Sequence, residues 1–330
     1  MRISILGGGG FLGQRIAARL AASGRLGAHP VTALTLFDIA APRTPQAAFP
    51  VQSVAGDVAD LPPAAIPPGT AVVFHLAAVV SAQAEADYDL GRRVNLRGTD
   101  AVVDACHALV AAGAPPPRVV FTSSVASFSG GQSAVLGDDA RQTPANSYGA
   151  QKAAAELVLA DATRRGFLDA VSIRLPTVIV RPGRPNKAAS SFLSAILREP
   201  LLGLPTELPV HEGFAAWVAS PRRAVEWLLH AAAMDTAPMG GDRSLTPPGM
   251  SVTVAEMLAA LDRVRPGAAD LVRRVDDPAI AAIVGTWPAA FIPARAESLG
   301  FAAHEPLDEV IRAFIADDLE ATRRDRAVSA

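Results

Sequence analysis

The stretch Ile3-Ser4-Ile5-Leu6-Gly7-Gly8-Gly9-Gly10-Phe11-Leu12-Gly13 decides the fold of this chain. Its first four residues are typical of a buried strand, and residues 14–23 behind it repeat apolar side chains with helical spacing. The glycines between them fit both the G-x-G-x-x-G and the G-x-x-G-x-x-G pattern. Glycine here permits a tight turn and a close approach of the backbone to a pyrophosphate, which a helix N-terminus attracts. We therefore predict a dinucleotide-binding loop, although four glycines in a row also suit a simple turn.

Strands and helices alternate along the first half of the chain. Short apolar runs predict strands, and the longer stretches between them with a 3.6-residue period predict helices. This alternation requires right-handed crossovers, and so a parallel sheet with helices on both faces. The predicted strands cover residues 3–6, 31–38, 51–54, 71–77, 118–123 and 170–175, and the predicted helices cover residues 14–23, 95–112 and 149–164.

The regular alternation ends after residue 175. One more strand and helix follow a proline-rich stretch, and two amphipathic helices lie closer to the C-terminus. This order predicts an α/β fold, a Rossmann-like doubly wound parallel sheet with a smaller, partly interleaved C-terminal substrate lobe. We assign residues 1–177 and about 213–236 to the dinucleotide-binding domain, and about 178–212 and 237–330 to the substrate lobe.

The composition excludes several classes of protein. Half of the 330 residues are apolar and the formal net charge is −2, so we expect a large core and no nucleic-acid partner. No apolar run is long enough to span a bilayer, so we expect no membrane partner. The N-terminus begins directly with a strand, which leaves no room for a signal peptide and predicts a cytoplasmic location. The single cysteine, Cys106, predicts no intramolecular disulfide, and we expect no metal site.

Acidic residues at the ends of two strands bear on the choice of cofactor. Asp38 ends the second predicted strand, where a carboxylate can accept both hydroxyls of an adenosine ribose and would repel a 2′-phosphate. This position favours NAD over NADP, although a turn-capping role is the alternative and Arg43 could meet a 2′-phosphate. Asp57 could bind the adenine amino group while Val58 packs on the ring, and a plain turn residue suits the pattern equally well.

A tyrosine and a lysine stand four residues apart at the start of a predicted helix. Tyr148 and Lys152 therefore share one helix face, and a nearby ammonium lowers the pKa of a phenol from its usual value of about 10. The chain has only two tyrosines and two lysines, so chance is a weak explanation for this pair. Thr122, Ser123 and Ser124 end the fifth predicted strand, at the sheet edge where open α/β sheets bind ligands. Together these residues predict a Ser–Tyr–Lys catalytic set.

These motifs together resemble the extended short-chain dehydrogenases/reductases, of the NAD-dependent epimerase/dehydratase type. That resemblance covers about the first 180 residues, and later stretches are similar to the subgroup of D-erythronate dehydrogenases. The family motifs are GGGGFLG at 7–13, Asp38, GDV at 56–58, FHLAA at 74–78, VNLRGT at 94–99, FTSS at 121–124 and Tyr148 with Lys152. The subgroup motifs are RLPT at 174–177, RPG at 181–183, PN at 185–186, AASSF at 188–192, REPL at 198–201 and SPRRAVE at 220–226.

The resemblance implies a role for each catalytic residue. Tyr148 would be the acid/base, Lys152 would bind the nicotinamide ribose, and Ser124 would hold the reacting oxygen, with Ser123 as the alternative. Asn95 would support a helix kink and a proton relay. The expected cofactor is NAD. The motifs and the resemblance together place its contacts at Gly7, Gly10, Phe11, Leu12, Gly13, Asp38, Asp57, Val58, Leu76, Ala77, Ala78, Asn95, Thr122, Tyr148, Lys152, Pro176, Thr177 and Val178.

Departures from the family pattern narrow the expected substrate. Val125 and Ala126 stand where dehydratases of this group carry an Asp-Glu pair, which disfavours elimination of water. The strand before the late helix lacks the arginine that would hold the diphosphate of a sugar nucleotide. These departures disfavour a sugar nucleotide, and the resemblance to the D-erythronate dehydrogenase subgroup implies NAD-dependent oxidation of a small anionic polyhydroxy acid, D-erythronate to 2-dehydro-D-erythronate. The candidate substrate contacts are Ser124, Tyr148, Thr177, Asn186, Ser190, Ser191 and Arg222.

Two other functions stay open at this point. One is an epimerase or reductase that acts on a sugar nucleotide, and the other is an NAD-binding regulator without turnover. The complete Ser–Tyr–Lys set argues against the regulator. Similar proteins dimerise through the helices near Asn95 and Tyr148, so we expect a homodimer. The alanine-rich face at Ala150, Ala153, Ala154 and Ala155 permits close packing.

Overall fold

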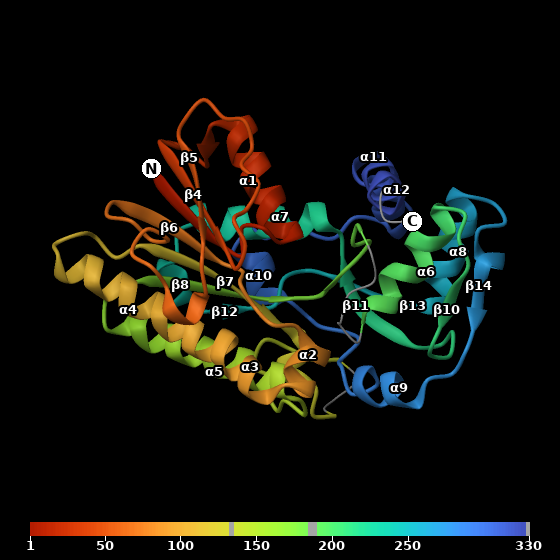
Figure 1. The fold of residues 1–330 in the computed structure, drawn as a ribbon. Helices are drawn as coiled ribbons and strands as arrows, with labels where there is room; N and C mark the ends of the chain where they lie inside the picture. Colours follow the sequence, from red (N-terminus) through yellow and green to blue (C-terminus); the bar gives the residue numbers. More distant parts are fainter. Residues whose placement is uncertain (132–134, 184–189, 328–330) are drawn as a thin grey trace.

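The computed structural model describes residues 1–131, 135–183 and 190–327. Its main feature is a seven-stranded sheet in the order β12-β8-β7-β6-β1-β4-β5, in which every neighbouring pair is parallel (Figure 1). The predicted Rossmann-like sheet is therefore confirmed. Its strands are β1 (Arg2–Leu6), β4 (Ala33–Asp38), β5 (Val51–Ala55), β6 (Thr70–His75), β7 (Arg118–Ser124), β8 (Asp169–Leu175) and β12 (Ser244–Leu245).

Helices cover both faces of this sheet (Figure 1). The helices α1 (Phe11–Ser23) and α7 (Pro221–Ala233) lie on one face, and α4 (Gly98–Ala111) and α5 (Ser147–Arg164) lie on the other. Because β1 pairs with β4 on one side and with β6 on the other, the chain reverses its winding at β1. A crevice opens beyond the carboxyl ends of the strands at such a point, and it is where this fold binds ligands.

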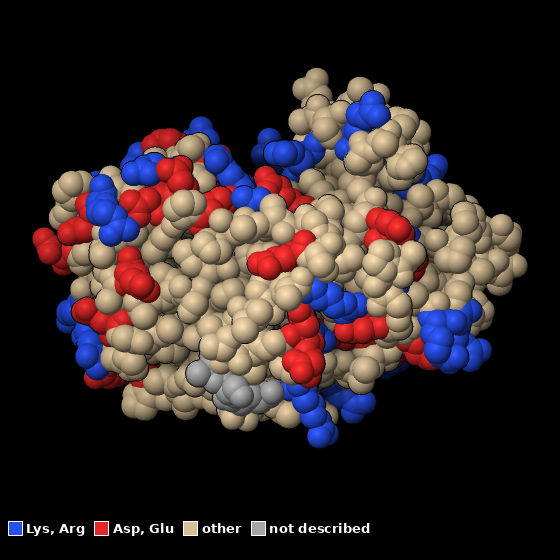
Figure 2. Space-filling view, turned by 180° about the vertical axis from the view of Figure 1, so that it is seen from behind, with Lys and Arg blue, Asp and Glu red and all other residues tan. Residues whose placement is uncertain are grey.

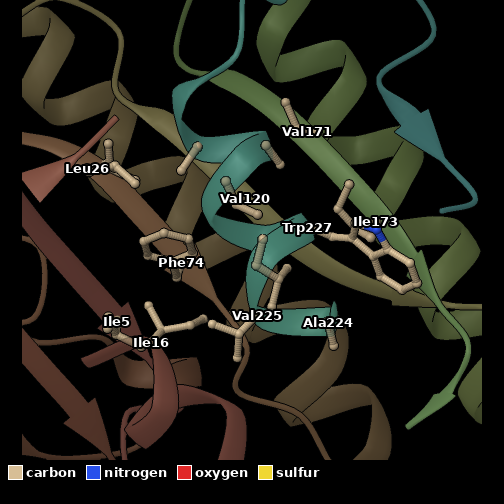
Figure 3. Close-up of a cluster of buried hydrophobic side chains, with 14 of the residues drawn as sticks. Ile5, Ile16, Leu26, Phe74, Val120, Val171, Ile173, Ala224, Val225 and Trp227 are labelled. Atoms are coloured by element: carbon tan, nitrogen blue, oxygen red, sulfur yellow. The ribbon is translucent and has the colours of Figure 1, made fainter. Parts of the chain in front are cut away.

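Alternate residues of the central strands point to opposite cores. Val120 of β7 packs beneath α7, whereas Val119 and Phe121 pack beneath α4 and α5. Figure 3 shows Val225 and Trp227 of α7 lying over the first of these cores. Each fully buried apolar side chain of this size stabilises the fold by roughly 1.5–3 kcal/mol, so the two cores fix the helices firmly on the sheet.

A smaller lobe lies beside the carboxyl edge of the sheet (Figure 1). It holds a three-stranded sheet in the order β13-β11-β9 and a two-stranded sheet of β10 and β14, with helices packed around a separate apolar core. Its strands are β9 (Thr177–Val178), β10 (Thr206–Leu208), β11 (Ala215–Ala219), β13 (Met250–Thr253) and β14 (Val272–Arg274). Its helices are α6 (Ser191–Leu201), α8 (Val254–Val264), α9 (Pro278–Val284), α11 (Leu307–Asp317) and α12 (Leu319–Ala327).

Three details differ from the sequence-based expectation. The strand β11 pairs with β9 and β13 and not with the large sheet, whereas the two-residue strand β12 joins the large sheet. The predicted helix from residue 95 is divided, because a π-helical turn at Arg93–Arg97 precedes α4, and this turn contains Asn95, at which the family resemblance implied a helix kink. The division into two domains stays a prediction.

The remaining elements are short. They are β2 (Arg25–Leu26), β3 (His29–Pro30), α2 (Ser81–Ala86), α3 (Tyr88–Arg92), α10 (Ala294–Ser298) and 3-10 helices at Val58–Asp60, Val125–Phe128, Ala237–Met239 and Ala269–Leu271.

Acidic and basic side chains are intermixed on the molecular face drawn in Figure 2. Ion pairs on the surface of the described residues include that of Arg263 with Asp308. In the part of the chain that the structure describes, no helix combines the length and the apolar character needed to cross a membrane.

Candidate active site

The glycine loop is shaped so tightly that side chains would not fit at two of its positions. Gly7 has φ +87°, and a Cβ there would lie 2.7 Å from the backbone nitrogen of Ala77. A Cβ at Gly13 would lie 2.2 Å from the carbonyl oxygen of Gly7. Gly10 precedes α1, whose first turn has no side-chain cap and no acidic residue, so its N–H donors are left for a ligand. These features fit a pyrophosphate held at the helix N-terminus.

Asp38 lies at the edge of this loop. Its carboxylate accepts hydrogen bonds from the N–H of Gly9 at 2.9 Å and of Ile39 at 2.8 Å. These contacts hold the side chain at the carboxyl end of β4, the position from which a carboxylate can reach an adenosine ribose.

Asp57 and Val58 are engaged with the protein itself. The Asp57 carboxylate forms an ion pair with Arg93 at 2.9 Å and accepts a hydrogen bond from the N–H of Ala59 at 2.8 Å. Val58 is buried against Gly98, where a Cβ would lie 2.7 Å from a methyl group of the valine. Asp57 and Val58 thus connect the end of β5 to the π-helical turn at Arg93–Arg97 and to α4. Their contact with the adenine stays a prediction.

A cavity of about 300 Å³ opens at the carboxyl ends of β1, β6, β7 and β8. Most of the predicted site residues line it. These are Gly7, Gly10, Phe11, Leu12, Gly13, Leu76, Ala78, Thr122, Ser124, Tyr148, Lys152, Pro176, Thr177, Val178 and Ser190. Ser123, named above as the alternative serine, also lines it, and the lining residues that the sequence analysis missed are Val80, Ser81, Val125, Leu175, Arg181 and Trp287.

Several predicted substrate residues lie elsewhere. Arg222 is half exposed and forms an ion pair with Asp317 at 2.6 Å, outside the residues that line the cavity. Ser191 begins α6, one residue beyond the lining residue Ser190. Asn186 lies outside the described residues.

Tyr148 stands in the first turn of α5, with its phenol in the cavity. The helix begins there because the side chain of Asn146 accepts a hydrogen bond from the N–H of Gly149 at 2.7 Å. A Cβ at Gly149 would lie 2.3 Å from the carbonyl oxygen of Ala126, so glycine lets the helix start approach the end of β7. Burial raises the pKa of Tyr148 to about 12, against the lowering effects of a hydrogen bond with Ser124 and of the charge on Arg181.

Lys152 is buried one helical turn further along. Its ammonium donates to the carbonyl oxygen of Thr122 at 2.7 Å and lies 5.6 Å from the centre of the Tyr148 ring. Burial lowers the pKa of Lys152 to about 7, while the nearby Glu156 acts in the opposite direction. The sequence predicted that Lys152 lowers the pKa of Tyr148. In the structure the lowering comes from the hydrogen bond with Ser124 and from the charge of Arg181.

The two serines at the end of β7 have different partners. The Ser124 hydroxyl accepts from the N–H of Ala126 at 3.1 Å and shares a hydrogen bond with Tyr148. The Ser123 hydroxyl instead donates to Glu156, which forms a buried ion pair with Arg174 at 2.8 Å. The geometry therefore places Ser124, and not Ser123, beside the phenol.

Asn95 lies in the π-helical turn and is 2% exposed. Its amide donates to the carbonyl of Val79 at 3.0 Å and to Gln151 at 2.7 Å, and its oxygen accepts from the N–H of Val79 at 2.9 Å. These bonds join the start of α4 to α5 and to the segment before α2, behind the cavity wall.

Arg181 is the missed residue with the clearest chemical consequence. Its guanidinium donates to the carbonyl of Val178 at 3.1 Å and to the hydroxyl of Ser190 at 3.2 Å. Burial lowers the pKa of Arg181 to about 10, so the side chain stays a cation near neutrality. No carboxylate among the described residues lies within ion-pair distance of it. With 28 arginines among 30 basic residues, its sequence position carried no signal comparable to that of Lys152.

Comparisons with known proteins show the family of this chain. The sequence profile of the NAD dependent epimerase/dehydratase family matches residues 3–215. A D-erythronate dehydrogenase from Cupriavidus necator is 47% identical over 326 residues, which cover 96% of this chain and 98% of that protein. A D-erythronate dehydrogenase from Haemophilus influenzae is 37% identical, covering 97% of this chain and 100% of its own.

A solved structure is also similar over its whole length. The nucleoside-diphosphate-sugar epimerase from Agrobacterium tumefaciens superposes with a TM-score of 0.91 at 42% identity, covering 98% of this chain and 96% of that one. The resemblance drawn from the motifs is therefore confirmed. The chain belongs to the NAD dependent epimerase/dehydratase family.

Proposed function

We propose that this protein is an NAD-dependent dehydrogenase that oxidises D-erythronate to 2-dehydro-D-erythronate. Two relatives named for this activity align with nearly the whole chain. The observation that carries the proposal is one cavity that contains Ser124, Tyr148 and Lys152 together with the cation Arg181, next to the glycine loop. The first three residues suit hydride-transfer chemistry at an alcohol, and the fourth suits an acid.

The residues around the loop fit NAD. The N-terminus of α1 would hold the pyrophosphate, Asp38 the adenosine ribose and Lys152 the nicotinamide ribose. NAD, when bound, supplies the hydride acceptor. Asp38 is the basis for proposing NAD over NADP, because its carboxylate would repel a 2′-phosphate.

Tyr148 is proposed as the general base. It takes the proton from the substrate hydroxyl as the carbon loses its hydride, while Ser124 holds the reacting oxygen by a hydrogen bond. The high pKa of the buried phenol makes the charges around it important, because each cation nearby favours the phenolate. Among the described residues that line the cavity, Arg181 is the cation whose charge lowers the pKa of Tyr148.

We assign the substrate carboxylate to Arg181. A buried guanidinium without an acidic partner can form charge-assisted hydrogen bonds with a carboxylate, which are stronger than those between neutral groups. The hydroxyls of Ser190 and Thr177 line the same wall and would add weaker contacts. Arg222 is not assigned this role because its guanidinium is bound to Asp317 outside the cavity.

The alternative is a sugar-nucleotide epimerase, as the similar protein from Agrobacterium tumefaciens is named. A diphosphate carries more negative charge than a carboxylate and calls for several cations. Lys152 donates to Thr122, and Arg181 remains as the cation available to a substrate among the described lining residues. This charge arrangement favours the small acid.

The test is to incubate the purified protein with NAD and D-erythronate, other four-carbon aldonates, the neutral erythritol or a UDP-sugar, and to follow NADH for oxidation and the sugar product for epimerisation. Arg181→Gln should lower kcat/KM for D-erythronate by about 10- to 150-fold, the equivalent of losing roughly 1.5–3 kcal/mol of charge-assisted contact. Comparable oxidation of erythritol by the wild type would refute the carboxylate contact. Epimerisation of the UDP-sugar without oxidation of any aldonate would favour the alternative.

We also propose a homodimer that packs through α4 and α5. Leu157 is 71% exposed and Val158 is 37% exposed on the outer side of α5, beside a groove that Val103 and Phe167 also line. Of the alanine-rich face, Ala155 points into the core and is unavailable for such packing. A cytoplasmic location stays a prediction from the sequence.

A further inference from the structure

The backbone of Arg181 is fixed by α6. Its N–H donates to the hydroxyl of Ser194 at 3.1 Å, and its carbonyl accepts from Arg198 at 2.8 Å. Both partners are almost completely buried, with exposed fractions of 1%. The position of the Arg181 guanidinium in the cavity therefore depends on how α6 holds this backbone.

Arg198 belongs to a cluster of three charges, in which Arg198 and Glu199 are buried and Arg326 is partly exposed. It pairs with Glu199 at 2.8 Å, and the same carboxylate oxygen pairs with Arg326 near the end of α12 at 2.6 Å. One carboxylate thus joins the arginine that holds Arg181 to the last helix of the chain.

The same helix contacts the backbone two residues beyond Arg181. Arg326 donates to the carbonyl oxygen of Gly183 at 3.2 Å, and the N–H of Gly183 donates to the hydroxyl of Thr322 at 3.3 Å. Thr322 is buried and lies one turn before Arg326 on α12. Figure 1 shows α12 beside α6, far in sequence from the segment that it holds.

We propose that Arg326 is a positioning residue for substrate binding. Through Glu199 and Gly183 it holds the segment that carries Arg181, so that the guanidinium faces the substrate carboxylate. The inference rests on the proposed role of Arg181. The C-terminal helix thereby controls the affinity for the acid without touching it.

The charges of the cluster show which substitution isolates this role. Arg326→Gln leaves Glu199 paired with Arg198, so the buried pair stays balanced. Glu199→Gln would instead leave two arginines facing each other without their shared carboxylate, and the variant could fail to fold. Arg323→Gln is the matched control, because Arg323 stands on the same helix but pairs with Glu320 at the exposed surface.

Steady-state kinetics of the full-length protein with NAD and D-erythronate test the proposal. Arg326→Gln should raise KM for D-erythronate about tenfold, with kcat and the Kd for NAD changed less than about twofold. Arg326→Lys should recover part of the affinity, because it restores the charge but not both hydrogen bonds. Arg323→Gln should match the wild type. An unchanged KM for Arg326→Gln would overturn the proposal, and so would a parallel loss of NAD binding.

The double variant Arg181→Gln/Arg326→Gln separates positioning from a general structural effect. If Arg326 acts through Arg181, the double variant should have the KM of Arg181→Gln alone. Additive increases in KM would overturn the positioning role while leaving the proposed function intact. If Arg181→Gln alone keeps the wild-type KM, the carboxylate assignment itself falls. Should Arg326→Gln not fold, Arg326→Lys carries the same comparison.

Discussion

In its proposed role as the general base, Tyr148 depends on its neighbours. Tyr148→Phe keeps the ring and removes the hydroxyl, so it should lower turnover at least about 100-fold, with NAD binding little changed. Turnover with D-erythronate and fluorescence titration with NAD measure the two effects separately. Near-normal turnover of Tyr148→Phe between pH 6 and pH 10 would show that another group accepts the proton.

The charge of Arg181 should influence the pH dependence of the reaction as well as substrate binding. Arg181 is one of two influences that lower the pKa of Tyr148 against the burial that raises it to about 12. Removing the cation disfavours the phenolate, so the pKa rises further and less base is present at any given pH. In Arg181→Gln, the rise of kcat with pH at saturating D-erythronate should therefore move to higher pH. Arg312→Gln, which alters an exposed pair with Glu309, should leave the profile in place.

Asp38 should determine the choice between the two nicotinamide cofactors. We expect NAD to bind at least tenfold more tightly than NADP, a difference of about 1.4 kcal/mol, and Asp38→Ala to narrow that difference. Isothermal titration with both cofactors measures it. Equal affinity of the wild type for NAD and NADP would remove Asp38 from this role.

The sequence alone could single out a site residue only where that residue type is rare in the chain. Tyr148 and Lys152 stood out because each is one of two residues of its type. Arg181 did not, because it is one of 28 arginines and no local pattern links it to Tyr148 on α5, whose pKa it lowers. Arg222 attracted attention at a helix start, but its partner Asp317 lies 95 residues further along the chain, where no local pattern links the two.

Among the elements, α5 carries Tyr148 and Lys152, the proposed catalytic pair, and is tied to the sheet by a buried ion pair. Glu156 is 2% exposed and accepts hydrogen bonds from Ser123, Arg174 and Gln142. Glu156→Ala would leave Arg174 as an uncompensated buried charge, so we expect the free energy of unfolding to fall by about 3–5 kcal/mol. Urea denaturation measures this loss.

A second pair on the same helix provides the control for this prediction. Asp161 pairs with Arg164 at the surface, where both side chains are more than half exposed. Asp161→Ala should change the free energy of unfolding by less than about 1 kcal/mol. A loss for Glu156→Ala no larger than that for Asp161→Ala would show that the buried pair does not hold α5 on the sheet.

Elements with a strong periodic pattern were predictable, and very short ones were not. The strands β1, β4 and β7 carry runs of buried apolar residues that need no tertiary information. The strands β9 and β12 have two residues each, too few for any period, and they form because neighbouring strands offer them backbone partners. The π-helical turn before α4 also has no local pattern, since it depends on the bonds of Asn95 to Val79 and Gln151.

At the scale of the whole molecule, ion pairs join the helices of the large sheet to the smaller lobe, close to the glycine loop. Arg15 of α1 and Arg222 of α7 both pair with Asp317 at the end of α11, and Arg15 also pairs with Asp318. The loop helix α1 is thus linked to the lobe that carries α12, whose Arg326 holds the segment of Arg181. The ends of the site that would receive NAD and the acid are therefore connected through the C-terminal helices, an arrangement that sequence order alone does not reveal.

The exposed apolar side chains on the outer face of α5 are the basis for predicting a homodimer. An exposed leucine beside an exposed valine is costly in water, and burial of such a side chain stabilises an interface by roughly 1.5–3 kcal/mol in each subunit. In a two-fold dimer the same substitution appears twice, so Leu157→Asp places two carboxylates in the contact. We expect a dimeric wild type and a monomeric Leu157→Asp variant in light scattering after gel filtration. Leu204→Asp, at an exposed leucine of the other lobe, should stay dimeric. A monomeric wild type, or a Leu157→Asp variant that stays dimeric, would rule out α4 and α5 as the interface.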